Sequence, residues 1–136
     1  MVSEILRAMS EANVEVVRDF TEAYIRGDHA AAVSYLAPDV VYEVGQEMPA
    51  RRPDEVPAMW ERWEAHWDRL ELIPEEYIDA GDQVMLAVRY SGRGRASGIE
   101  FEDRLFEVYT LHDGRIARKR DFKTRSEALE AAGLSE

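Results

Sequence analysis

The sequence predicts an α+β fold in which a curved antiparallel sheet wraps around the helices that precede it. Two observations carry this prediction. In the first half of the chain, apolar residues recur every three to four positions, which is the spacing of amphipathic helices. From Leu70 onward, strand-like segments alternate with turns that contain glycine. Because 136 residues suffice to bury one core, we expect a single domain over residues 1–136.

The chain is expected to open with a short helix at residues 2–9 and a second helix that Ser10 caps. In the second helix, Val16, Phe20 and Tyr24 share one apolar face. This helix is expected to end at Gly27, and the next helix is expected to begin directly after it.

Asp28 suits the N-cap of that next helix, which is predicted over residues 29–36 and stops before Pro38. Residues 40–44 indicate the first strand, and residues 45–53 form a loop. A third main helix is predicted over residues 54–69. The aromatic wall expected around a flat ligand comprises Tyr24, Tyr42, Trp60, Trp63 and Trp67. Core packing is the alternative interpretation, and both hold if the pocket is an unfilled part of the core.

The second half of the chain is predicted to form the sheet. Its strands are expected at residues 70–80, 83–91, 99–111 and 116–123, followed by a closing helix at residues 126–132. The loop at residues 92–98 contains Gly-Arg-Gly-Arg, which we interpret as a mobile hairpin loop rather than an anion site. A pocket between a curled sheet and its helices is the usual place for a small apolar ligand.

Composition excludes several classes of function. The formal net charge of −11 argues against nucleic acid or an anionic membrane as a partner. The chain has no cysteine, and its first residues lack a signal peptide, so we expect a cytoplasmic protein without disulfides. The histidines, His29, His66 and His112, lack the spacing of a metal site, and there is no phosphate loop. We therefore expect no metal and no cofactor.

Two segments carry a resemblance to a known family. Residues 16–28 (VVRDFTEAYIRGD) with 36–40 (LAPDV) resemble the opening of SnoaL-like proteins, and residues 104–116 (RLFEVYTLHDGRI) resemble their closing hairpin. The chain is thus similar to the SnoaL-like (polyketide cyclase-like) branch of the nuclear transport factor 2-like, ketosteroid isomerase-like superfamily. This resemblance implies a cone-shaped, cystatin-like barrel with one apolar pocket. The superfamily holds isomerases, cyclases, epoxide hydrolases and non-enzymes.

The resemblance also implies which chemistry to expect. Phe20 and Val44 stand where ketosteroid isomerases have a tyrosine donor and a carboxylate base, and Glu107 matches their third position. Val88 and Tyr90 stand where limonene epoxide hydrolases have an Arg-x-Asp pair. Neither route is therefore expected here.

The same resemblance points to Asp121, since cyclases of the SnoaL type have an acid–base aspartate at this position. They usually have histidine where this chain has Glu107. The alternation of its strand places Glu107 on the more apolar face, between Leu105 and Tyr109, where burial would raise the pKa of its carboxyl. The alternative is an ion pair with a cation of residues 118–120.

Whether Asp121 joins Glu107 depends on the register of the last hairpin. A two-residue turn pairs Asp121 with Phe106, on the opposite face. A three-residue turn with Gly114 in a bulge pairs it with Leu105 and brings it into the pocket, and the resemblance favours this register. The alternative is a surface ion pair within the basic run at 118–123.

Two further expectations concern surfaces. The basic run is expected to pair with acidic residues of the neighbouring strand, namely Glu100, Glu102 and Asp103, rather than to bind nucleic acid. An apolar strip of Phe106, Val108 and Thr110 lies on the face opposite the pocket, and strips of this kind are usually covered. We therefore expect a homodimer.

Two functions from different classes follow. The first is a cofactor-free enzyme of isomerase, cyclase or hydrolase type, in which Asp121 moves a proton or activates a water and Glu107 donates a hydrogen bond, or the reverse. The second is a non-catalytic domain that binds a hydrophobic molecule or dimerises. In both, the partner is a small hydrophobic molecule. The expected ligand-binding residues are Phe20, Tyr24, Tyr42, Trp60, Trp63 and Tyr109.

Overall fold

The computed structural model describes residues 2–134 and contains one sheet with helices on both faces. The elements in chain order are α1 (Val2–Ile25), α2 (His29–Val33), β1 (Leu36–Tyr42), the 3₁₀ helix η1 (Pro53–Glu55), α3 (Val56–Glu64), β2 (Trp67–Ala80), β3 (Gln83–Gly94), β4 (Glu100–His112), β5 (Arg115–Phe122) and α4 (Arg125–Ala131).

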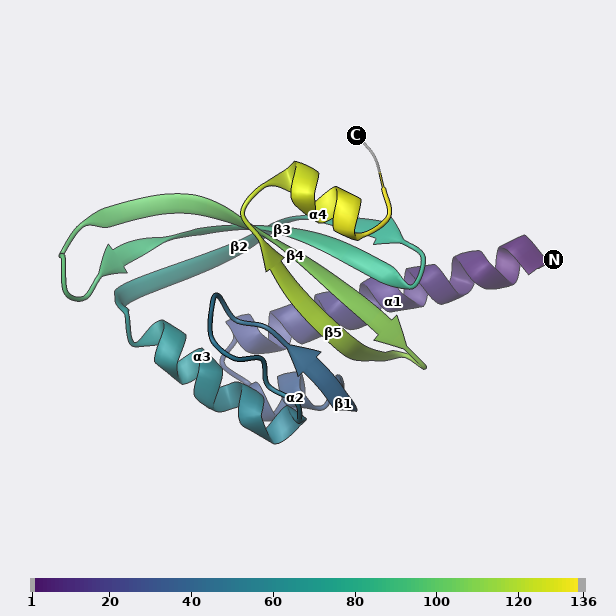
Figure 1. The fold of residues 1–136 in the computed structure, drawn as a ribbon, viewed down its shortest axis with the longest axis horizontal. Helices are drawn as coiled ribbons and strands as arrows, with labels where there is room; N and C mark the ends of the chain where they lie inside the picture. Colours follow the sequence, from purple (N-terminus) through teal and green to yellow (C-terminus); the bar gives the residue numbers. More distant parts are fainter. Residues whose placement is uncertain (1, 135–136) are drawn as a thin grey trace.

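The sheet has the strand order β1-β5-β4-β3-β2. Helices α1, α2 and α3 lie on one side of it, and α4 lies on the other (Figure 1). This arrangement confirms the predicted α+β class. The sheet is mixed rather than wholly antiparallel, because β1 pairs in parallel with β5. No hairpin joins these two strands, so the turn geometry that enforces antiparallel pairing elsewhere does not act on β1.

Helix α1 is a single element, and the predicted break at Ser10 is wrong. Ser10 lies inside the helix, where its hydroxyl donates to the carbonyl of Arg7 at 3.0 Å. A serine bonded backward in this way is compatible with a continuous helix. The predicted cap at Asp28 is confirmed, because its carboxylate accepts from the backbone N–H of Ala31 at 3.1 Å.

Several element boundaries differ from the predictions because strand pairing overrides local periodicity. Strand β1 begins at Leu36, before Pro38, which is tolerated there because β1 is an edge strand. Helix α3 ends at Glu64 instead of residue 69, since Trp67 already pairs with Gly94 in the β2–β3 ladder. The loop expected at 92–98 is therefore partly strand.

The last hairpin has a register that neither expected alternative describes. Asp113 and Gly114 form its two-residue turn with positive φ angles of 50° and 75°, as a tight hairpin turn requires. A one-residue register shift then follows within the hairpin. This bulge places Asp121 directly opposite Glu107, so the two side chains share one face of the sheet.

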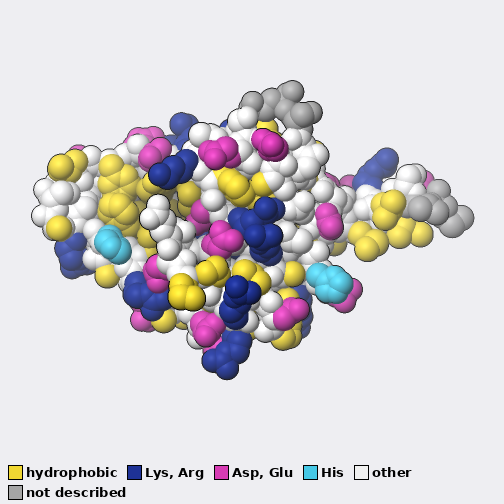
Figure 2. Space-filling view, viewed as in Figure 1, with side chains coloured by type: hydrophobic (Ala, Val, Ile, Leu, Met, Phe, Trp, Pro, Cys, Tyr) yellow, Lys and Arg dark blue, Asp and Glu magenta, His cyan; other side chains and the backbone are white. Residues whose placement is uncertain are grey.

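Helix α4 covers the strip that was expected to form a dimer interface. Phe106 and Val108 are buried in a small second core, together with Leu129 of α4. The reason offered for a homodimer is therefore wrong, because the chain covers the strip itself. Dimerisation stays a prediction. Exposed apolar side chains occur instead on the part of α1 that projects from the body in Figure 2, at Ile5, Leu6 and Met9.

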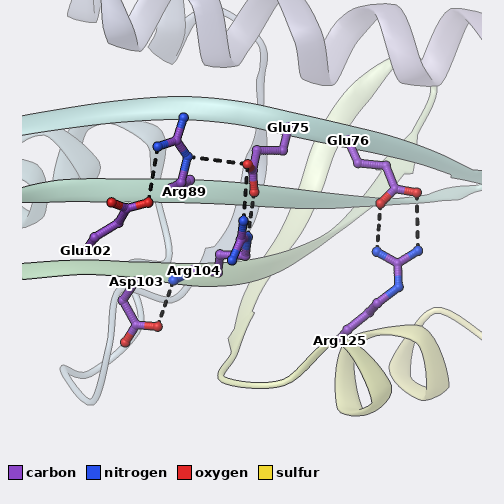
Figure 3. Close-up of polar contacts among 7 residues, drawn as sticks. All are labelled: Glu75, Glu76, Arg89, Glu102, Asp103, Arg104 and Arg125. Carbon is purple, nitrogen blue, oxygen red and sulfur yellow. Dashed lines mark hydrogen bonds and ion pairs between the residues drawn. The ribbon is translucent and has the colours of Figure 1, made fainter.

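The charges at the start of β4 pair with β2 and β3, and the expected pairing with β5 is wrong. Glu102 binds Arg89 at 3.1 Å, and Arg104 binds Glu75 at 2.7 Å (Figure 3). The reason is length, since the ladder between β4 and β5 reaches no further than Phe106. Over residues 2–134, no helix combines the length and the apolar character needed to cross a membrane.

Candidate functional site

A cavity of about 380 Å³ lies between α1, α3 and the sheet face that they cover. The six residues proposed above as ligand-binding all line it, namely Phe20, Tyr24, Tyr42, Trp60, Trp63 and Tyr109. Trp67 does not. It belongs to β2 and packs against Phe101, with ring centroids 4.4 Å apart. From here on, the aromatic wall means these six residues. They come from two helices, α1 and α3, and two strands, β1 and β4, and do not include Trp67.

Phe20 is the centre of this aromatic wall. Its ring lies 5.8 Å from Tyr109, 6.1 Å from Trp60 and 6.2 Å from Tyr42, measured between centroids. Trp60 also donates from its indole nitrogen to the Tyr42 hydroxyl at 3.2 Å. Aromatic pairs prefer tilted and edge-on contacts of this kind. These contacts join rings from α1, α3, β1 and β4 into one cluster.

The structure places both predicted carboxylates, Glu107 and Asp121, in this cavity. They are direct cross-strand partners on β4 and β5, and each side chain is 14% exposed. Cβ atoms of such partners are about 5 Å apart. A single ligand atom or a pair of bonded atoms can therefore contact both carboxyl groups at once.

Lys119 was expected only as one of three possible ion-pair partners of Glu107, and the structure shows this ion pair inside the cavity. Its side chain is buried, and its ammonium lies 2.6 Å from Asp121 Oδ1 and 3.5 Å from Glu107 Oε2. It also donates to the carbonyl oxygen of Glu43 at 2.8 Å. The signal was present, because residues two apart on a strand share a face. Once Asp121 is placed in the pocket, Lys119 must follow.

Each carboxylate has a further hydrogen-bond donor. Tyr109 donates from its hydroxyl to Glu107 Oε1 at 2.7 Å. The backbone N–H of Gly45 donates to Asp121 Oδ2 at 3.2 Å. Gly45 has a φ of 56°, a left-handed conformation that glycine adopts without strain. The loop after β1 is thereby turned so that a backbone donor reaches the cavity.

Burial sets the protonation of the cluster. The loss of water raises the pKa of the Glu107 carboxyl, and the nearby charge of Asp121 adds to this effect, against the opposing pull of Lys119. Burial by itself lowers the pKa of the Lys119 ammonium, but the charges of Asp121 and Glu107 outweigh burial and raise it. Burial likewise raises the pKa of the Tyr109 hydroxyl.

This arrangement provides a proton donor beside a proton acceptor. With Lys119 charged, one negative charge makes the cluster neutral. Glu107 lies farther from the ammonium than Asp121, at 3.5 Å against 2.6 Å, and burial raises the pKa of Glu107, so both features favour the proton on Glu107. Among residues 2–134, no three histidine, aspartate or glutamate side chains are placed to hold a metal ion. The two carboxyl groups, Glu107 and Asp121, are able to give and to accept a proton.

Four positions that the family resemblance matched to catalytic residues of other superfamily members also line the cavity. They are Phe20, Val44, Val88 and Tyr90. Three of these four are apolar here, so they shape the walls and supply no proton. The charged groups Glu107, Lys119 and Asp121 lie instead on β4 and β5.

Comparison with known proteins gives one family and many structural relatives. Residues 17–119 match the family described as the SnoaL-like domain. None of the curated proteins is similar enough to match. An NTF2-like protein from Burkholderia thailandensis is 28% identical, with a TM-score of 0.75 over 90% of this chain and 97% of that one.

Two other solved structures share the fold at lower identity. A candidate SnoaL-like polyketide cyclase from Jannaschia is 22% identical, with a TM-score of 0.74 over 91% of this chain and 92% of that one. TerC, co-crystallized with polyporic acid, is 17% identical, with a TM-score of 0.72 over 90% of this chain and 98% of that one. These likenesses show an NTF2-like, ketosteroid isomerase-like fold.

Proposed function

The chain belongs to the SnoaL-like domain family, as its motifs predicted, and from this premise we propose that it is a cofactor-free acid–base enzyme acting on a small hydrophobic molecule. One observation carries the proposal: Asp121 and Glu107 lie side by side in one aromatic cavity. An apolar cavity with a few convergent polar groups of shifted pKa is the usual form of an active site.

The chemistry follows from the states of the two carboxyl groups. Asp121 is the base, and it takes a proton from a carbon next to a carbonyl group or from a water molecule. Glu107 is the acid, and it donates a hydrogen bond or a proton to the oxygen on which negative charge develops. Because the two groups are neighbours on one sheet face, both act on the same side of a flat substrate.

The ligand is held by aromatic surface. Phe20, Trp60 and Tyr109 present ring faces and edges to the cavity, which suits an apolar compound with a single polar group directed at the sheet. The relative TerC was co-crystallized with polyporic acid, which supports a small organic molecule as the ligand class.

A second candidate function is binding without catalysis. The apolar residues Phe20, Val44 and Val88 stand where related enzymes place catalytic groups, and this observation favours a pocket that only holds a hydrophobic molecule. Such a protein would need the aromatic wall but not the base.

Asp121→Asn separates the two functions, since asparagine keeps the shape and cannot accept the proton. Hydrophobic carbonyl compounds and epoxides would be screened for turnover by the wild-type chain. With a substrate found, we expect kcat/KM of the variant to fall by about 100-fold or more, with ligand affinity retained. Asp103→Asn, at an exposed position of β4, is the matched control. Unchanged turnover in Asp121→Asn would contradict the enzymatic proposal and leave the binding function.

A further inference from the structure

We infer that Lys119 is a positioning residue that assigns the two roles, because it neutralises Asp121 and leaves the proton on Glu107. The inference rests on the proposed function, which gives the two carboxyl groups their roles. It concerns a residue that touches both of them and that need not touch the substrate.

The ammonium of Lys119 lies among oxygen atoms of the protein. An ammonium has three N–H donors. Asp121 Oδ1 lies at 2.6 Å, the carbonyl oxygen of Glu43 at 2.8 Å and Glu107 Oε2 at 3.5 Å. A protonated amine is not a nucleophile, so we infer that Lys119 acts on the reaction through the two carboxyl groups beside it.

The contacts of Lys119 are unequal, and this inequality distinguishes the two carboxyl groups. Asp121 is 0.9 Å closer to the cation than Glu107, as the distances of 2.6 and 3.5 Å show. Asp121 also accepts from the N–H of Gly45, whereas Glu107 accepts from the neutral hydroxyl of Tyr109. The Lys119 ammonium compensates the charge of one carboxylate. If Asp121 and Glu107 were both ionised, one buried negative charge would have no counterion.

Other ionisable groups near Glu107, Asp121 and Lys119 do not change which of the two carboxyl groups carries the proton. Those that face or line the same cavity region are Tyr24 from α1, Tyr42 from β1, Tyr77 from β2, Tyr90 from β3, Tyr109 from β4 and Lys123 after β5. Burial raises the pKa of the five tyrosine hydroxyls, so they stay neutral near neutral pH. The charge near Glu107 is thus set mainly by Lys119 and Asp121.

The inference can be tested without a substrate, by NMR titration of the Glu107 carboxyl in the ligand-free protein. Lys119→Met removes the cation and keeps a long side chain. We expect the midpoint of Glu107 to rise by about one pH unit or more, because the attraction that opposes burial is lost. Arg118→Met, on the same strand but with a half-exposed side chain, should leave the midpoint in place. The signal that disappears in Glu107→Gln identifies the residue.

For a second variant, Asp121→Asn, we expect the midpoint of Glu107 to shift in the opposite direction. This variant keeps the test valid even if Lys119→Met does not fold. In Asp121→Asn, Glu107 becomes the nearest counterion of Lys119, so its midpoint should fall by about one pH unit or more. Adding Lys119→Met to Asp121→Asn should raise it again. A purely structural lysine would change the free energy of unfolding without moving these midpoints. An unmoved midpoint in Asp121→Asn overturns the inference, whatever Lys119→Met does.

The titrations and the turnover assay fail independently. If the midpoints move as expected and no hydrophobic carbonyl compound or epoxide is turned over, the role of Lys119 stands and the enzymatic function falls. If turnover depends on Asp121 and the midpoints do not move, the function stands and the inference about Lys119 is wrong.

Discussion

Glu107 should make the stability of this protein fall as pH rises, which is opposite to the effect of an ordinary ion-paired carboxylate. Burial and the charge of Asp121 raise its pKa in the folded chain. Glutamate in an unfolded chain has a pKa of about 4.3. Above that pH the folded chain holds a proton that the unfolded chain has released. The stabilisation is therefore complete below about pH 4.3 and is lost as pH rises through the folded pKa.

The size of this stability change depends on the pH range between the unfolded and the folded pKa of Glu107. Between the unfolded and the folded pKa of Glu107, its contribution to the free energy of unfolding falls by about 1.4 kcal/mol per pH unit. The side chain is only 14% exposed, so solvent screens it little. Lys119, at 3.5 Å, favours the charged form of Glu107 and so narrows the pH range between its unfolded and its folded pKa. Its own pKa is raised above that of an ordinary lysine, so it stays charged from pH 4 to 9 and adds no slope of its own there.

Glu107→Gln isolates this term, because glutamine resembles the protonated acid and cannot ionise. Denaturant unfolding of wild type and variant would be measured from about pH 4 to 9. We expect the variant to gain stability relative to wild type as pH rises, and the difference to level off above the folded pKa. Glu100→Gln, whose side chain on the same strand is 70% exposed, is the control and should show no such trend. A difference between Glu107→Gln and wild type that is the same at pH 4 and at pH 9 would refute the reasoning.

Two further predictions concern folding stability and assembly. Leu129 is buried in the second core under α4, so Leu129→Ala should lower the free energy of unfolding by about 2–5 kcal/mol in denaturant titration. A loss well below that range would mean that α4 does not complete the core. We still expect a homodimer, now without the apolar strip as its basis, and light scattering at micromolar concentration should give twice the chain mass. A monomer mass would contradict it.

Local patterns were sufficient to predict the class of the fold and the aromatic wall except for Trp67, which lies on β2 outside the cavity. Phe20 and Tyr24 follow the helical period, and Glu107 and Tyr109 follow the alternation of a strand. Both periods are properties of the backbone within one element, so the sequence alone determines which side chains share a face. The family resemblance pointed to Asp121 in the same way, by its position in a motif.

Pairing between distant segments decided the rest. The parallel contact of β1 with β5 and the burial of Val108 under α4 join residues that no local period relates. The site itself depended on a single β-bulge, because a shift of one residue decides which side of the sheet Lys119 and Asp121 face. Sequence determined that these charges lie two residues apart on one strand. Only the tertiary structure decided that both are buried beside Glu107, since register is set by contacts across the sheet.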